Sequence, residues 1–242
     1  ELSHRLPALI SEARERDDLL AASTLHIRHS YVAFLASDEP ERARENLQDA
    51  IAHWSHAGFW SQHYFALVAK TEIALALGEG QKAWELLTDN WRVLERSRLL
   101  WVQLLRIESR HLLARTALAA AAEAAALEER ADAFLESAEQ DARRIEREHV
   151  QWGNPLAALV RAAVATTRRE PETALRFVVA AEDGFKTAGM ALHAVVARRR
   201  RGELLGGQEG RALVAGADAW MDSQDITNPA RMSAMLAPGR WT

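Results

Sequence analysis

The feature that most constrains the fold is a pattern that recurs about every 40 residues along the chain. Each copy opens with polar residues, continues with a small anchor alanine and then places apolar residues three or four positions later. The anchors Ala43, Ala83, Ala131 and Ala174 are 40, 48 and 43 residues apart, and a weaker fifth copy starts near Ala212. Self-similarity at this period is typical of stacked helical pairs, because one pair cannot bury its apolar face alone.

The apolar residues follow the period of an α-helix. Within 43–54, 64–75 and 174–185 they recur three or four positions apart, which is the spacing of one helical face. No stretch alternates apolar and polar residues in the way that predicts a strand. We therefore predict an all-α fold in which residues 1–242 form one domain, a right-handed α-solenoid of about five antiparallel helical hairpins. A short helix in 225–242 is expected to fold back and cap the last hairpin.

Proline and glycine mark the expected helix boundaries. Polar caps followed by a proline inside the helix predict starts at Asp38, Asn154 and Asn228. Expected helix ends, where a left-handed residue closes the last turn, lie near Gly58, Gly78, Gly189, Gly202 and the Gly206–Gly207 pair.

One long stretch has no such mark. Residues 112–148 contain neither glycine nor proline, so helix propensity alone predicts one continuous helix. The repeat requires a turn near 122–129. We favour the turn, because a continuous helix leaves its small-residue face without partners.

Composition excludes several classes of function. A formal charge of −4 gives no electrostatic reason to expect nucleic acid or an anionic membrane as a partner. The chain has no cysteine, which excludes disulfides and thiolate metal sites. No apolar run approaches the ~20 residues that span a bilayer, and the first residues carry no signal-peptide pattern. Because the chain begins at Glu1, we expect a soluble, cytoplasmic piece of a longer protein.

Two segments carry a family resemblance. The hairpins around LALGEGQKAWELL resemble tetratricopeptide repeats of the longer, divergent type. The segment DAWMDSQDITNPARMSAMLAPGRW, residues 218–241, is similar to the C-terminus of large bacterial serine/threonine protein kinases of the eukaryotic-like type. In those proteins a long repeat array follows an N-terminal kinase domain, often with an ATPase-like region between them. The resemblance implies a C-terminal signalling module.

The chain lacks the sequence motifs of a kinase catalytic domain. There is no Gly-rich loop with a paired lysine, no His-Arg-Asp catalytic loop and no Asp-Phe-Gly motif. The order of Asp183, Gly184 and Phe185 differs from that motif, and they lie in a predicted helix. We therefore expect no enzymatic activity in this fragment.

Three histidines invite a metal-site interpretation. His53 and His56 are neighbours on one helical face, and His63 starts the next helix; His26 and His29 repeat the first spacing. Three imidazoles suffice for zinc in some sites, but no H-E-x-x-H signature is present. We favour turn and groove-lining residues, and expect no metal or other cofactor.

Tryptophans and arginines are the other candidates. Trp60 follows a predicted turn and is a candidate peptide anchor, whereas Trp84, Trp91 and Trp101 are expected to lock one helical pair onto the next. The run Arg198–Arg201 is expected to lie in water at a helix C-terminus. A phosphate-contacting role for this run is the alternative, without aromatic support.

We expect the solenoid to bind a protein or peptide, or to sense a ligand, on its concave face, and to pass that state to the rest of a parent protein. Arginines on successive inner helices would suit an acidic segment. The alternatives are an oligomerisation or scaffold domain of an ATPase-type transcriptional regulator, a homodimer, or a histidine-rich metal-binding protein. The candidate binding residues are Trp60, His63, Tyr64, Arg106, Arg110 and Arg161.

Overall fold

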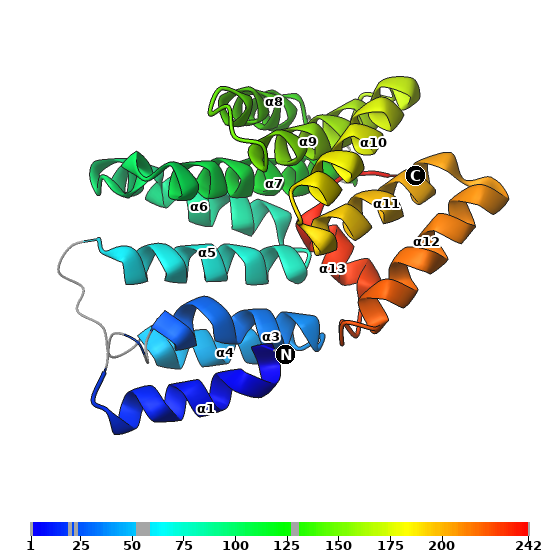
Figure 1. Ribbon diagram of the computed structural model, residues 1–242. Coiled ribbons are helices and arrows are strands. Elements are labelled where there is room, and N and C mark those ends of the chain that lie inside the picture. Colours follow the sequence, from blue (N-terminus) through cyan, green and yellow to red (C-terminus); the bar gives the residue numbers. More distant parts are fainter. Residues whose placement is uncertain (1, 19–20, 22–23, 52–58, 127–130, 242) are drawn as a thin grey trace.

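The computed structural model (Figure 1) describes residues 2–18, 21, 24–51, 59–126 and 131–241. These residues form an all-α structure, 82% helical, and contain no strand. The helices are α1 (Leu2–Glu15), α3 (Tyr31–Ala36), α4 (Pro40–Ile51), α5 (Ser61–Ala76), α6 (Gly80–Arg96), α7 (Gln103–Ala126), α8 (Asp132–Glu146), α9 (Gly153–Thr167), α10 (Pro171–Thr187), α11 (Ala191–Leu205), α12 (Gly207–Asp222) and α13 (Pro229–Leu236), with the short helices η1 (His26–Ser30) and η2 (Leu99–Trp101).

From α3 to α12 each helix packs against the next one in the chain, and α3, α5 and α7 each also contact the next odd-numbered helix. We call α3, α5, α7, α9 and α11 the inner layer and α4, α6, α8, α10 and α12 the outer layer. Most residues of α5 are buried, whereas α6 buries one stripe only, as expected for a helix that faces water on its other side. No helix in the described residues is long and apolar enough to span a bilayer.

The anchor alanines hold the two layers together. Ala43, Ala83 and Ala174 are completely buried, which lets neighbouring helices approach closely. Ala131 is half-buried at the start of α8, and Ala212 is exposed. The fifth anchor is therefore not Ala212.

In α12 the position equivalent to the anchor alanines is occupied by Gly210. A Cβ at Gly210 would lie 2.3 Å from the carbonyl oxygen of Gly202 in α11, closer than any real contact. Gly202 was predicted to end a helix, but it lies inside α11 and serves this close approach. Two glycines facing each other replace the alanine of the earlier copies.

Other predicted boundaries agree with the structure. Gly78, Gly189 and Gly206 have positive φ values of 75°, 71° and 61° and follow helix ends. Asn228 caps α13 by accepting a hydrogen bond from Arg231 N at 3.0 Å. The start of α9 falls at residue 153, one position before the predicted cap, and Gly58 lies outside the described residues.

The stretch without proline or glycine is not one helix. Helix α7 ends at Ala126, α8 begins at Asp132, and the two pack against each other. The chain therefore reverses between them, as the repeat predicted. The small residues of α7 are buried by this arrangement, among them Ala114, Ala117 and Ala121.

Candidate binding surface

The inner layer carries the C-terminal segment of the chain on its free side, which we call the inner face. Helix α13 packs against α5, α11 and α12, and Figure 1 shows it crossing between the two ends of the molecule. Thr227 N donates to the Ala36 carbonyl at 2.9 Å, and Arg231 pairs with Asp38 at 2.7 Å. The segment was predicted to cap the last hairpin, and α13 does pack on α11 and α12. It also links these last helices to the first hairpin.

Apolar side chains hold this segment in place. Met232, Met235, Leu236 and Trp241 are all buried. The indole of Trp241 donates to the Ala237 carbonyl at 3.0 Å. This side of the segment is therefore part of the hydrophobic core.

A buried arginine fixes α13 to the inner face. Arg115 of α7 donates from Nε and Nη2 to the Met235 carbonyl, at 3.1 and 2.8 Å, and pairs through Nη1 with Glu72 of α5 at 2.9 Å. Tyr31 donates to the other oxygen of Glu72 at 2.8 Å. Burial, together with Glu72, raises the pKa of Tyr31 well above its usual value. The phenol thus stays a donor.

The inner face is open at its other end. A cavity of ≈220 Å³ lies there. Arg28 stacks over the Phe65 ring at 4.5 Å, and Glu108 accepts a hydrogen bond from Tyr64 at 2.7 Å. The cavity thus combines a cation, a carboxylate and apolar walls. We call it the inner pocket; its lining residues are Arg28, His29, Tyr31, Val32, Phe65, Val68 and Glu108.

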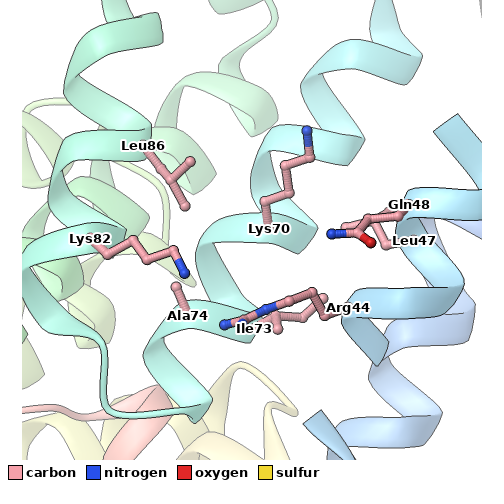
Figure 2. Close-up of a pocket in the computed structure, with 8 residues that line it drawn as sticks. All are labelled: Arg44, Leu47, Gln48, Lys70, Ile73, Ala74, Lys82 and Leu86. Carbon is pink, nitrogen blue, oxygen red and sulfur yellow. The ribbon is translucent and has the colours of Figure 1, made fainter. Parts of the chain in front are cut away.

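A second cavity, of ≈170 Å³, lies on the opposite side of α5, between α4 and α6. Figure 2 shows Arg44 of α4 and Lys82 of α6 extending toward each other across α5, with Lys70 at the other end. We call this cavity the outer cleft. Its lining residues are Arg44, Leu47, Gln48, Lys70, Ile73, Ala74, Lys82 and Leu86.

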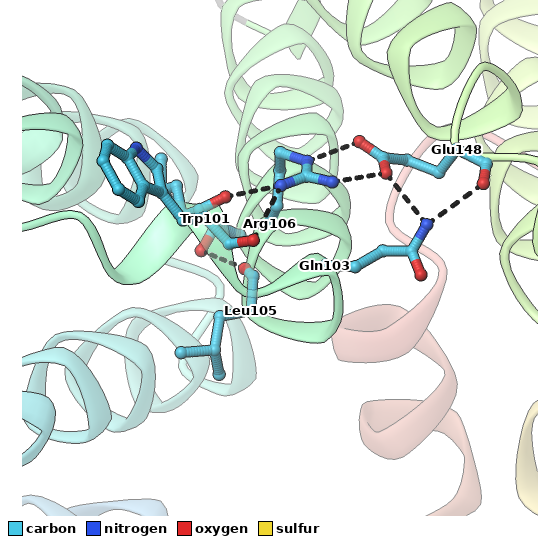
Figure 3. A network of polar contacts seen from close by, with 7 residues as sticks. Trp101, Gln103, Leu105, Arg106 and Glu148 are labelled. Carbon is cyan, nitrogen blue, oxygen red and sulfur yellow. Dashed lines mark hydrogen bonds and ion pairs between the residues drawn. The ribbon is translucent and has the colours of Figure 1, made fainter.

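Arg106 of α7, a predicted binding residue, joins the connection before α7 to the one after α8. Its guanidinium pairs with Glu148 at 2.5 and 2.7 Å and donates to the Leu100 carbonyl at 2.7 Å (Figure 3). Gln103 donates to the same Glu148 carboxylate at 3.2 Å. The hydrogen bonds from Arg106 lower the pKa of Glu148. The donors of Arg106 are therefore engaged within the chain.

Arg110 and Arg161 also reach the outer layer. Arg110 pairs with Asp141 of α8 at 3.1 Å and stacks over Trp91 of α6 at 4.5 Å. Arg161 of α9 pairs with Glu146 at 2.8 Å. A role of these arginines in ligand binding stays a prediction.

The remaining predicted residues lie at the start of α5. Trp60 is 61% exposed. The Nδ1 atom of His63 accepts a hydrogen bond from Trp60 N at 3.1 Å, which caps the helix. Tyr64 is completely buried and positions Glu108, so it offers no surface to a ligand.

The metal-site interpretation rests on residues that the structure leaves undescribed. His53 and His56, as well as the side chain of His26, lie outside the described residues. The described part of the chain contains no group of three potential metal ligands. A site at His53, His56 and His63 therefore stays a prediction.

The arginine run does not form a solvated face, contrary to expectation. Arg198 and Arg201 both pair with Glu182 of α10, at 3.1 and 2.8 Å, and that carboxylate is buried. Arg199 pairs with Asp218 of α12 at 2.7 Å, and Arg200 is itself buried. The run joins α11 to its two neighbours.

An apolar edge is exposed where α7 begins. Trp101, Val102 and Leu104 are 73%, 53% and 52% exposed. Trp101 was predicted to lock two helical pairs together, and it does not. Among the described residues, only Arg98 stacks on its ring, at 5.2 Å.

Sequence reasoning missed Arg28, Phe65, Glu108 and Arg115. Arg115 had a visible signal, since it is the single charge in the apolar run 112–122. The three residues of the inner pocket had none, because they come from η1, α5 and α7 and meet only in the folded chain. Comparisons of the chain with protein-family models, with curated proteins and with solved structures find no match.

Proposed function

We propose that the chain is a non-catalytic protein-interaction or sensor module that binds a helical peptide of a partner on the inner face. In this proposal the helices form a right-handed, tetratricopeptide-like α-solenoid of about five hairpins, and the inner face is its concave side. In the same proposal the module is the C-terminal domain of a bacterial serine/threonine protein kinase, which the resemblance of residues 218–241 supports. Binding would be transmitted as a difference in affinity between two states of that parent.

The packing of α13 on the inner face is the observation that carries this proposal. An amphipathic helix lies on the inner face with its methionines buried and one main-chain carbonyl bound by Arg115. Helices with an apolar stripe are a common class of ligand for grooves of this kind. At the other end of the inner face, the inner pocket offers Arg28, Phe65 and Glu108 to a further segment.

A selection experiment tests the proposal. A displayed library of helical peptides is selected against the full chain, and the enriched peptides are tested on two variants. Val32→Arg places a long cation at the inner pocket, where Val32 is 39% exposed, and should weaken binding at least tenfold. Asp89→Arg places the same side chain on the exposed side of α6 and should leave binding unchanged. Failure to enrich any peptide, or equal binding by both variants, would contradict the proposal.

Self-association is a second candidate, favoured by the exposed edge at Trp101, Val102 and Leu104. Contiguous exposed apolar side chains of this size mark interaction sites. Light scattering over a range of concentrations should then give a dimer mass for the native chain and a monomer mass for Trp101→Ser. A monomer at every concentration would remove this candidate.

A further inference from the structure

The outer layer leaves four intervals between its helices, and the fourth, between α10 and α12, is bridged from α11 by Arg201 and Arg199. The first lies between α4 and α6 over α5, the second between α6 and α8 over α7, and the third between α8 and α10 over α9. In a stack of similar hairpins, equivalent positions face each interval. What fills the intervals can therefore be compared residue by residue.

Aromatic rings close the second and third intervals. In the second, Trp84 of α6 and Phe134 of α8 meet edge to face, with their ring centroids 5.5 Å apart. In the third, the guanidinium of Arg161 lies 5.7 Å from the Phe177 ring centroid, held by Glu139 and Glu146. Edge-to-face rings stabilise a fold beyond the area that they bury, and a cation over a ring adds an electrostatic attraction.

The first interval has no aromatic residue at the two positions that hold the rings of the second interval. Trp84 directly follows the anchor Ala83, and Phe134 lies three positions after the anchor Ala131. At the same positions around the first interval the chain has Arg44, after Ala43, and Leu86, after Ala83. A guanidinium and a short aliphatic chain replace two rings, and the outer cleft of ≈170 Å³ remains. Apolar cavities of about 150 Å³ accept a molecule the size of benzene.

The charges around the outer cleft are unbalanced. Arg44 and Lys82 share one carboxylate, Glu79, at 2.7 and 2.9 Å. Burial alone would raise the pKa of Glu79, but its hydrogen bonds to these two cations lower it. Lys70 pairs with no carboxylate among the described residues and stands at the other end of the cleft (Figure 2). An exposed ammonium group thus lines the cleft without a counter-charge among the described residues.

We propose that the outer cleft binds a small aromatic carboxylate. Its ring would lie between Leu47, Ile73 and Leu86, where the next interval holds its own rings. Its carboxylate would pair with Lys70. This site is separate from the inner face, since the two cavities lie on opposite sides of α5 and have no residue in common.

The probe for this site is 3-phenylpropionate, titrated into the full chain by calorimetry. We expect one molecule to bind per chain. The neutral isostere 3-phenylpropanamide and the ring-free propionate should each bind at least about tenfold more weakly, because an ion pair or the ring contact is lost. Equal binding of the acid and the amide, or no saturable binding of the acid, would overturn the proposal.

Two variants locate the binding. The double variant Arg44→Trp/Leu86→Phe restores the ring pair of the second interval and should abolish binding while it keeps or raises the melting temperature. Lys70→Gln should weaken binding of the acid about tenfold and leave the amide unaffected. Lys186→Gln, a lysine of α10 that is about half exposed, is the matched control and should bind normally. If the double variant does not fold, Lys70→Gln decides alone. Unchanged binding there would contradict the proposal.

Discussion

The two ends of the inner face differ in how their cations are used. At the covered end, Arg115 is buried and makes hydrogen bonds to Met235 and Glu72. At the open end, Arg28 is half-buried and stacks on Phe65, and no hydrogen bond joins it to the described residues. A buried charge must be paired or it is costly. The covered end is therefore a fixed part of the core, whereas the open end keeps donors for a partner.

Removing the cation of the covered end should have the largest effect on stability. Arg115→Met leaves the Met235 carbonyl and the Glu72 carboxylate without their partner, which costs about 3–5 kcal/mol for a buried pair. Urea unfolding followed by circular dichroism measures the loss. The control Arg42→Ala removes an exposed arginine paired with Glu39 and should change the free energy of unfolding by less than about 0.5 kcal/mol. Equal losses in both variants would mean that Arg115 does not hold the covered end.

The second largest effect on stability is expected at the contact between α11 and α12. Gly210→Ala places a Cβ 2.3 Å from the Gly202 carbonyl oxygen, so the helices must separate. We expect the free energy of unfolding to fall by about 1–3 kcal/mol. The packing of α13 should also weaken, because α13 packs on both helices. A Gly210→Ala chain that unfolds at the same urea concentration as the native chain would refute this close approach.

Acid should weaken the covered end. Burial, with Arg115 nearby, lowers the pKa of His111 well below 6.5 and that of His193 to about 4. Below pH 6.5 the unfolded chain therefore binds more protons than the folded chain. Stability should be complete above pH 6.5 and fall between pH 6.5 and 4, by on the order of 1 kcal/mol per pH unit for each histidine.

Unfolding midpoints between pH 7 and pH 5 measure this loss. His111→Gln should make the unfolding midpoint depend less steeply on pH, because it removes one of the two titrating groups. His29→Gln at the open end should reduce it less, since burial and Arg28 lower the pKa of His29 to a smaller extent. The reverse order of the two variants would argue against a covered end with neutral histidines.

The smallest expected effect is a gain. Gly216 is exposed in α12, and a Cβ there would meet no atom within 4 Å. Gly216→Ala should stabilise the chain by about 0.5–1 kcal/mol through helix propensity. Any loss of stability would show that the exposed side of α12 is in contact with something.

The all-α fold could be predicted from the sequence because its signals are local. The cap at Asn228 and the left-handed glycines at 78 and 189 depend on neighbours only. The anchor at Gly210 was also visible, since GQEG at 207–210 repeats GQKA at 80–83. The expected alanine is replaced by glycine there because a Cβ would meet the Gly202 carbonyl oxygen.

The path of the C-terminal segment could not be predicted. It depends on contacts between residues far apart in the sequence, such as Arg115 with Met235 and Asp38 with Arg231. The arginine run was misread for a similar reason, because its partner Glu182 lies on the preceding helix. Residue type and spacing predict which helix forms, but they do not predict which charges meet.

Hydrogen exchange of α13 tests most directly whether the inner face holds a helix. A helix of eight residues is only marginally stable in water by itself. Slow exchange of its amide hydrogens would therefore show that packing on the inner face stabilises it. We predict that the amides of 232–237 exchange as slowly as those of α5 in the native chain. In Arg115→Met they should exchange faster, while those of α9 should not change. Exchange within seconds in the native chain would contradict the account.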